Sequence, residues 1–105
     1  MKKILVIGGG AMGSAFTVPC IENKNKVIIT EPYSKIFIKD LTSKNKFHSA
    51  LKIKLPKKLE FEKFSRELLK KKFDLIVIAL SLSGIDFIGK ELKNLKVKNP
   101  ILVLT

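Results

Sequence analysis

Residues 4–13 read Ile-Leu-Val-Ile-Gly-Gly-Gly-Ala-Met-Gly, a short apolar run that ends in closely spaced glycines. Gly8, Gly10 and Gly13 have the spacing G-x-G-x-x-G. The apolar run is typical of a buried strand, and the residues after it have a helical pattern. A strand, this glycine spacing and a helix, in that order, form the fingerprint of a dinucleotide-binding βαβ unit. The alternative is a glycine-rich turn without a ligand.

Each glycine has its own expected role at this turn. Gly8 allows a tight turn off the strand, Gly10 lets the backbone approach a pyrophosphate, and Gly13 lets the helix pack closely on the strand. The helix begins near Ala11 and Met12, where free N–H groups and the positive end of the helix dipole favour phosphate binding. We therefore expect these five residues to form the cofactor-binding loop.

Composition indicates a single globular domain over residues 1–105. The chain is 46% hydrophobic and 29% charged, which is ordinary for a folded domain. No apolar run approaches the roughly 20 residues that a membrane span needs. Cys20 is the only cysteine, so there is no internal disulfide and the sequence agrees with a reducing compartment. We expect a cytoplasmic protein without a membrane span.

The formal net charge is +12, from 21 lysines and arginines against nine acids. Specific nucleic-acid contacts rely heavily on arginine and on interleaved aromatic residues, whereas here lysine is spread along the whole chain and Arg66 is the only arginine. We therefore expect no specific nucleic-acid partner. The positive field would still attract an anionic cofactor or a phosphorylated substrate.

Strand-like and helix-like segments alternate along the chain. Strands are expected at residues 2–7, 27–30, 59–61, 75–80 and 101–104. Helices are expected at residues 11–23 and 35–43, in a short stretch from Ser65, and from a Ser83–Asp86 capping box to about Asn94. Residues 45–58 are a polar connection without clear periodicity.

Continuous apolar strands of this kind are typical of a parallel sheet covered on both faces. Right-handed crossovers then favour the strand order 3-2-1-4-5. The expected fold is a Rossmann-type, doubly wound α/β sheet in a three-layer α/β/α arrangement. The residues expected to face the sheet are Met12, Ala15, Phe16, Cys20 and Ile21 in the first helix, and Ile36, Phe37 and Leu41 in the second.

In such a sheet the ligand lies at the carboxyl ends of the first and fourth strands, where the strand order reverses. The fourth strand ends at Ala79, Leu80 and Ser81, and small residues here would let the backbone approach a cofactor. Glu31 closes the second strand, where a carboxylate can accept hydrogen bonds from ribose hydroxyls and repel a 2′-phosphate. Glu31 thus favours NAD over NADP, whereas Lys35 favours NADP. A solvated loop acid is the alternative for Glu31.

No catalytic or metal-binding group stands out in the sequence. His48 is the only histidine and has no carboxylate partner nearby in the sequence. Ser14, Ser81 and Ser83 lack a neighbouring base that would activate them, so they are better interpreted as helix caps or cofactor contacts.

Residues 8–27, GGGAMGSAFTVPCIENKNKV, resemble the start of NAD(P)-dependent glycerol-3-phosphate dehydrogenases. The matching positions are Ala11, Met12, Ser14, Ala15, Val18, Pro19, Asn23, Asn25 and Val27. His48 with residues 51–56 (LKIKLP) is similar to that family's His-Pro-x-Leu-Gly-x-x-Leu segment, and residues 81–85 (SLSGI) to its S-x-x-G-[VI] element.

The resemblance implies an enzyme that moves a hydride between NAD(P)H and dihydroxyacetone phosphate, giving sn-glycerol 3-phosphate for phospholipid synthesis. It places His48 near the nicotinamide side of the cleft, with an ordinary loop histidine as the alternative. Two other interpretations also stay open. One is a ketopantoate-reductase-like domain, because those enzymes begin GAGAMGS, and the other is a nucleotide-binding module without chemistry.

Some positions depart from the family pattern. Lys24 follows Asn23 where the family has a glycine, so this turn lacks a residue suited to a positive φ angle. Thr30 stands in place of the usual tryptophan. The family's catalytic lysine belongs to an all-helical second domain, which also binds the phosphorylated triose or polyol. We therefore expect a cofactor-binding half that is inactive alone and exposes an apolar face suited to homo-oligomer formation.

Overall fold

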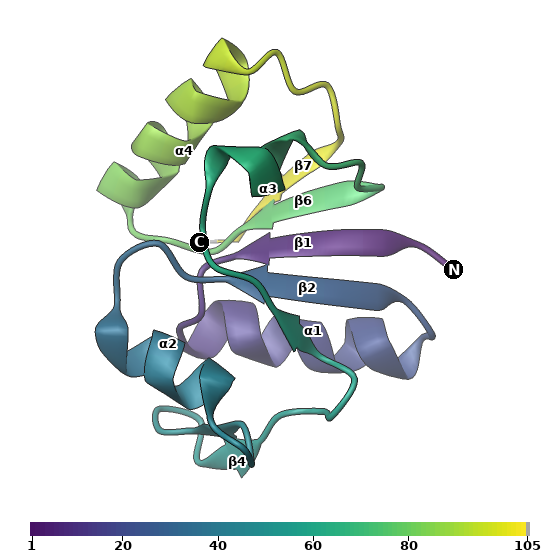
Figure 1. The fold of residues 1–105 in the computed structure, drawn as a ribbon, viewed down its shortest axis with the longest axis vertical. Coiled ribbons are helices and arrows are strands. Elements are labelled where there is room, and N and C mark those ends of the chain that lie inside the picture. Colours follow the sequence, from purple (N-terminus) through teal and green to yellow (C-terminus); the bar gives the residue numbers. More distant parts are fainter. Residues whose placement is uncertain (105) are drawn as a thin grey trace.

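A five-stranded parallel sheet forms the centre of this structure, a computed structural model that describes residues 1–104 (Figure 1). Its strands are β1 (Lys3–Ile7), β2 (Lys26–Thr30), β5 (Glu60–Phe61), β6 (Leu75–Ile78) and β7 (Ile101–Val103). They lie in the order β5-β2-β1-β6-β7. Counted within this sheet alone, that is third, second, first, fourth and fifth. The Rossmann-type fold is confirmed, and the order reverses between β1 and β6.

The connection between the second and third sheet strands contains structure that the sequence did not predict. β3 (Phe47–His48) and β4 (Ile53–Lys54) form a small antiparallel hairpin in which His48 pairs with Ile53. The hairpin lies beside α2 (Lys35–Thr42), below the sheet in the view of Figure 1. Strands of two residues are too short to show an alternating pattern, so residues 45–58 looked irregular.

Four helices cover the sheet: α1 (Ala11–Glu22), α2, α3 (Arg66–Lys70) and α4 (Leu82–Asn94). Ser34 caps α2 by accepting a hydrogen bond from the Phe37 N–H at 3.2 Å, and Ser65 caps α3 in the same way. The predicted Ser83–Asp86 capping box is wrong. α4 starts two residues earlier, with Ser81 at the N-cap position, and Asp86 instead pairs with Lys90.

Alternate residues of β1 enter two separate apolar cores. Leu5 and Ile7 pack with residues of α3 and α4, whereas Ile4 and Val6 pack on the opposite face with Leu41 of α2 and with residues of α1. These four residues of β1 are each at most 5% exposed. Burial of each such side chain contributes roughly 1.5–3 kcal/mol, so this short strand belongs to the most stable part of the fold.

The inward face of α1 differs from the prediction. Its buried residues are Gly13, Ser14 and Thr17, whereas Met12 and Ala15 are exposed. The helix lies so close to the sheet that a Cβ atom at Gly13 would collide with the Gly8 carbonyl oxygen. Small residues are required at that distance, and the larger Phe16, Cys20 and Ile21 are only partly buried.

Two further burial predictions are wrong. In α2, Leu41 is buried and Phe37 partly buried, but Ile36 is 66% exposed. In β7, the three residues are 39–45% exposed, because this strand has β6 on one side and forms the edge of the sheet. Both segments are apolar in sequence, and apolar character alone does not separate an edge from a core position.

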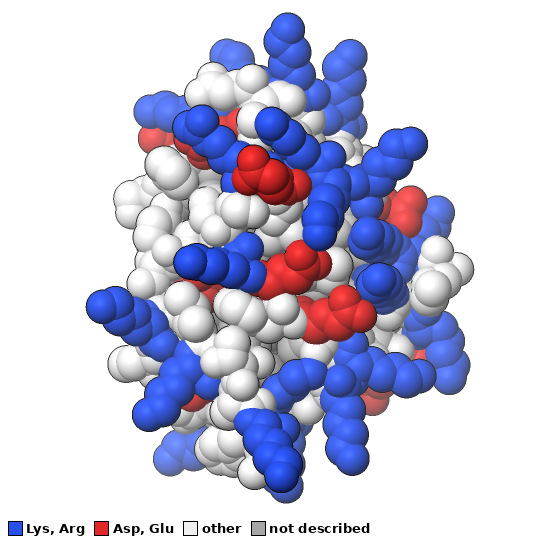
Figure 2. All heavy atoms as spheres, in the orientation of Figure 1, with Lys and Arg blue, Asp and Glu red and all other residues white. Residues whose placement is uncertain are grey.

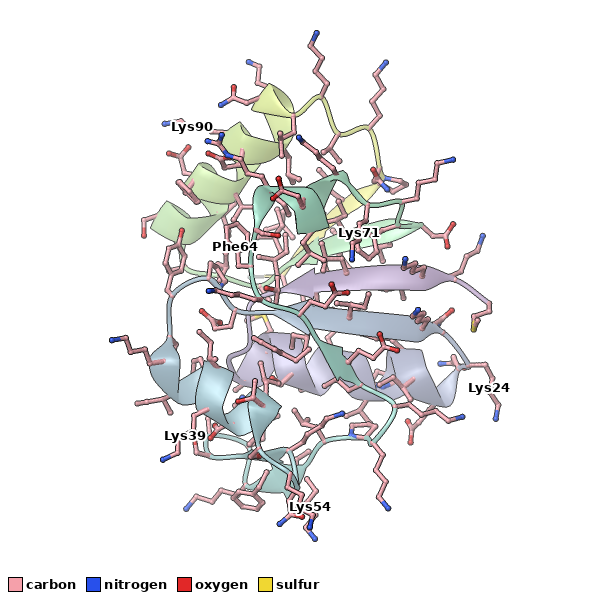
Figure 3. The ribbon with its side chains drawn as sticks, viewed as in Figure 1. Lys24, Lys39, Lys54, Phe64, Lys71 and Lys90 are labelled. Atoms are coloured by element: carbon pink, nitrogen blue, oxygen red, sulfur yellow. The ribbon has the colours of Figure 1, made fainter. Side chains whose placement is uncertain are left out.

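On the face shown in Figure 2, the positive charge is spread out and not gathered in one stripe. Lys and Arg side chains project along most of its outline, with acidic groups between them. In Figure 3, Lys24, Lys39, Lys54 and Lys90 point outward from four different parts of the chain. The distribution is that of a solvated surface with a general positive field.

The turn from α1 to β2 keeps the left-handed conformation although it has no glycine. Lys24 has φ 68°, and its N–H donates to the Ile21 carbonyl at 2.9 Å. Lys46, Lys52 and Lys96 also have positive φ angles. A side chain in this conformation costs roughly 1–2 kcal/mol.

We therefore predict that Lys24→Gly raises the free energy of unfolding by about 1 kcal/mol, measured by urea denaturation. The control is Lys98→Gly, at an exposed lysine outside the left-handed positions, which should lower stability by up to about 1 kcal/mol through chain entropy. Equal effects of the two substitutions would contradict the prediction.

Candidate dinucleotide-binding site

A groove of about 320 Å³ lies at the carboxyl ends of β1 and β6, where the strand order reverses. Its lining residues are Gly10, Ala11, Met12, Glu31, Ser34, Phe37, Ala79, Leu80, Ser81 and Leu104. The structure thus brings together most of the residues that the sequence predicted for the site. Ser34, Phe37 and Leu104 are additions, and only the fold reveals their proximity.

Two larger hollows lie elsewhere and are lined mainly by lysines. One of about 490 Å³ includes Lys24, Lys26 and Lys58, and one of about 540 Å³ includes Lys44 and Lys54. These are long, flexible and solvated side chains, which define no fixed geometry. The groove at the switch point is smaller, but its lining contains no lysine and includes the backbone of Gly10 and the short side chains of Ala11 and Ala79.

The first turn of α1 opens on this groove. Gly10 is the N-cap residue, and no side chain among residues 1–104 caps the helix there, in contrast to α2 and α3. The first N–H groups of a helix have no partner within the helix. Those of Ala11 and Met12 are therefore available to an anion, and the helix dipole adds a favourable potential.

Gly10 leaves room that any side chain would fill. A Cβ atom at this position would lie 3.3 Å from Cε2 of Phe37, which forms the facing wall of the groove. Bare backbone at the helix start suits the close approach of a dinucleotide's pyrophosphate.

Gly8 and Gly13 act in packing and do not line the groove. Gly8 has φ 124°, and a Cβ atom there would collide with the Ala79 carbonyl. Its N–H donates to the Thr30 carbonyl at 2.8 Å, which extends the pairing of β1 with β2. Because Gly13 in turn touches the Gly8 carbonyl, the two outer glycines let strand, loop and helix approach closely.

Gly9 carries the densest hydrogen bonding in the loop, and the sequence analysis assigned it no role. Its N–H donates to Oε1 of Glu31 at 2.6 Å. Its carbonyl accepts from Oγ of Ser14 at 2.9 Å and contacts Nε2 of His48 at 2.7 Å. The sequence offers one indication of its importance, a glycine at position 9 that the G-x-G-x-x-G spacing does not require. The structure gives the reason, because a Cβ atom there would lie 2.6 Å from the Leu41 side chain.

Glu31 is only 5% exposed, which excludes the alternative of a solvated loop acid. Besides the Gly9 N–H on Oε1, its Oε2 accepts from the N–H groups of Tyr33 at 2.8 Å and Ser34 at 2.9 Å. A carboxylate has about four acceptor sites, so three are in use and one on Oε1 is left. The residue both ties two loops together and faces the groove.

His48 is fully buried behind the loop and is absent from the groove lining. Its ring stacks on Phe37 with centroids 5.3 Å apart. Nδ1 accepts a hydrogen bond from the Leu51 N–H at 3.2 Å, so Nε2 carries the proton and donates to the Gly9 carbonyl. The residue belongs to β3 and is enclosed, so it does not lie in a solvated loop, and its role in cofactor binding stays a prediction.

Lys35 and Thr30 lie outside the groove lining. Lys35 is the exposed first residue of α2. Thr30 ends β2 fully buried, and its Oγ1 has no hydrogen-bond partner within residues 1–104.

Two general properties bear on the possible chemistry. Within the described residues, none of the helices has the length and apolar character to cross a membrane. No three His, Cys, Asp or Glu side chains in that part of the chain converge as ligands for a metal ion.

A parallel sheet of this order, with a groove at its switch point and an uncapped helix start facing it, defines a dinucleotide-binding domain of the Rossmann type. The family described as NAD-dependent glycerol-3-phosphate dehydrogenase N-terminus matches residues 3–105. This chain belongs to that family, and its cofactor is accordingly NAD(H).

Among solved structures, the complex of D-mandelate dehydrogenase with NADH is similar to this chain, with a TM-score of 0.61 and 21% sequence identity. The similarity covers 97% of this chain but 30% of the other, so the chain spans less than a third of that protein. At this identity the likeness shows the shared fold. No curated protein matches the sequence.

The hairpin that carries His48 is attached to α2 by Asp40. Oδ2 of Asp40 accepts from the N–H of Ser49 at 2.9 Å and from its Oγ at 2.7 Å. These two hydrogen bonds, the backbone one first, lower the pKa of the Asp40 carboxyl below its ordinary value of 3.8.

A carboxyl whose pKa is lower in the folded state stabilises the fold above its unfolded pKa, and this contribution is lost as the pH falls through the folded pKa. We predict that Asp40→Asn lowers the urea midpoint at about pH 7 and that its difference from wild type shrinks as the pH falls through the pKa of the folded Asp40 carboxyl, which lies below its ordinary value of 3.8. Asp86→Asn, which removes an exposed pair with Lys90, should have a smaller effect. A pH-independent difference for Asp40→Asn would contradict the prediction.

Proposed function

We propose that the groove binds NAD(H) with its pyrophosphate at the start of α1, against the N–H groups of Ala11 and Met12. The observation that carries this proposal is the uncapped first turn of α1 beside the bare backbone of Gly10. Ala79, just after β6, and Ser81, at the N-cap position of α4, also line the groove. The bare backbone of Gly10 and the short side chains of Ala79 and Ser81 let the cofactor contact backbone directly.

We propose that Glu31 selects NAD over NADP. Its remaining acceptor site on Oε1 suits a ribose hydroxyl, and its negative charge opposes a 2′-phosphate at close range. Lys35 is exposed and outside the groove, where a flexible ammonium discriminates less than a fixed group. The general positive field attracts both cofactors and does not distinguish them.

The reaction that we propose is that of a glycerol-3-phosphate dehydrogenase, in which NAD(H) supplies or accepts the hydride and dihydroxyacetone phosphate is interconverted with sn-glycerol 3-phosphate. The residues of this chain bind and orient the dinucleotide, and the surface lysines help to attract both anions. We propose a cytoplasmic role in glycerol-3-phosphate and phospholipid metabolism.

These residues alone should not turn the substrate over. The chain's one histidine is fully buried, and both of its ring nitrogens are hydrogen-bonded to backbone. It therefore has no free position from which to exchange a proton with a substrate.

The binding proposal is tested with Gly10→Val and NADH fluorescence titration. Valine should weaken binding about 100-fold or more, because its side chain would occupy the pyrophosphate position and press on Phe37. The matched control is Gly89→Val on α4, where an added Cβ meets nothing within 4 Å, and it should bind like wild type. Equal affinity of the Gly10 variant and wild type, or oxidation of glycerol 3-phosphate by the chain alone, would refute the proposal.

Cofactor choice is tested by parallel titrations with NADH and NADPH. Wild type should prefer NADH by about tenfold, and Glu31→Gln, which removes the charge but keeps the shape, should reduce this ratio severalfold. Lys35→Ala should leave the ratio unchanged. If the lysine variant alters the ratio and the glutamate variant does not, Lys35 is the selector.

We also propose self-association through exposed apolar residues, those of the edge strand β7 and, in α4, Leu82 and Phe87, which are 82% and 45% exposed. Sedimentation velocity should show association that rises with concentration and falls in Leu102→Lys. Ile36→Lys, at an exposed position on α2, is the control and should associate like wild type. A monomer at all concentrations, without binding of a hydrophobic dye, would contradict this.

A further inference from the structure

Three side chains from three separate elements converge on the Gly9 peptide groups. Glu31 follows β2, Ser14 is the fourth residue of α1, and His48 belongs to β3. All three are at most 5% exposed. They make one hydrogen bond to the Gly9 N–H and two to its carbonyl, at 2.6–2.9 Å.

Of the three contacts, that of His48 spans the greatest sequence distance and has a fixed direction. The Leu51 N–H, at 3.2 Å, occupies the lone pair of Nδ1 and leaves the proton on Nε2. The ring is thus held as a donor toward the Gly9 carbonyl, 39 residues away in the sequence.

His48 also supports the wall that faces Gly10. Its ring stacks on Phe37 at a centroid separation of 5.3 Å and an interplanar angle of 21°. The same Phe37 ring lies 3.3 Å from the position of a Cβ atom at Gly10. His48 therefore fixes the loop on one side of the groove and an aromatic ring on the other.

From this arrangement we propose that His48 is a positioning residue for dinucleotide binding. By donating from Nε2 to the Gly9 carbonyl, it sets the direction of the Gly9–Gly10 peptide and thereby aims the first N–H groups of α1 at the groove. The residue acts from behind the loop and touches no part of the cofactor. This inference rests on the proposed NAD(H)-binding function.

The test compares two amide substitutions of similar polarity. In His48→Gln, the amide nitrogen can reach the place of Nε2 and restore the donor to Gly9. In His48→Asn, the shorter side chain can reach only the place of Nδ1, next to the Leu51 N–H. NADH affinity is measured by fluorescence titration under conditions where urea denaturation shows every variant to be folded.

We expect His48→Gln to bind within about threefold of wild type, and His48→Asn to bind about tenfold or more weakly, the scale of one hydrogen bond. Leu92→Ala is the control for lost stability, because it opens the opposite core between α4 and the sheet and should leave affinity unchanged. Equal binding by the two amide variants, or an equal loss in Leu92→Ala, would overturn the inference.

A second readout separates this inference from the proposed function. Nitrogen-15 NMR of wild type should show His48 neutral with the proton on Nε2, and the Gly9 and Gly10 amide signals should move more in His48→Asn than in His48→Gln. If wild type binds no NADH, the proposed function fails. In that case His48 has no role in NADH binding either. A proton on Nδ1 of His48 would overturn the inference even if wild type binds NADH.

Discussion

The fixing of the Gly9 peptide groups is the interaction on which the site depends. A glycine between a strand and a helix has the widest conformational freedom of any residue, and here a carboxylate, a hydroxyl and an imidazole remove it. Each of these groups is buried, and loss of Glu31 would leave the Gly9 N–H unsatisfied at about 1–3 kcal/mol, whereas the Gly9 carbonyl would keep one donor if either Ser14 or His48 were lost. Stability and the shape of the loop before α1 are therefore set by the same contacts.

The four glycines of the opening motif divide these tasks. Gly8 and Gly13 allow backbone to pass close to backbone, Gly9 receives the buried hydrogen bonds, and Gly10 leaves the groove open. Contact between Gly8 and Ala79 also joins the two halves of the sheet at the point where the strand order reverses. The groove therefore lies at the same place as the contact that joins the two halves of the sheet.

Much of this could be predicted from the sequence, because it follows from patterns within short windows. The apolar run before Gly8 predicted β1, and the alternation of strands and helices predicted the sheet order. Glu31 was placed correctly at the end of β2 by its distance from the glycines, as its position in the groove lining shows.

What could not be predicted depends on distances between elements. The buried face of α1 consists of Gly13, Ser14 and Thr17 because the helix lies close to the sheet, and no hydrophobic pattern encodes that separation. The burial of His48 needs the hairpin and α2 to meet. Likewise, the exposure of β7 depends on its place at the edge and not on its apolar residues.

The close seating of α1 has a mechanical consequence. A helix that meets a sheet through glycine and short hydroxyl side chains has no flexible layer in which to shift, and its start is held by a hydrogen bond from Ser14 to Gly9. A ligand at such a helix start meets walls that are already in place, so little conformational entropy is lost when it binds. Affinity in a site of this kind is governed by how well the shape of the ligand matches the rigid groove. A close mimic of the pyrophosphate should therefore gain as much binding free energy from the start of α1 as the pyrophosphate of the whole cofactor does.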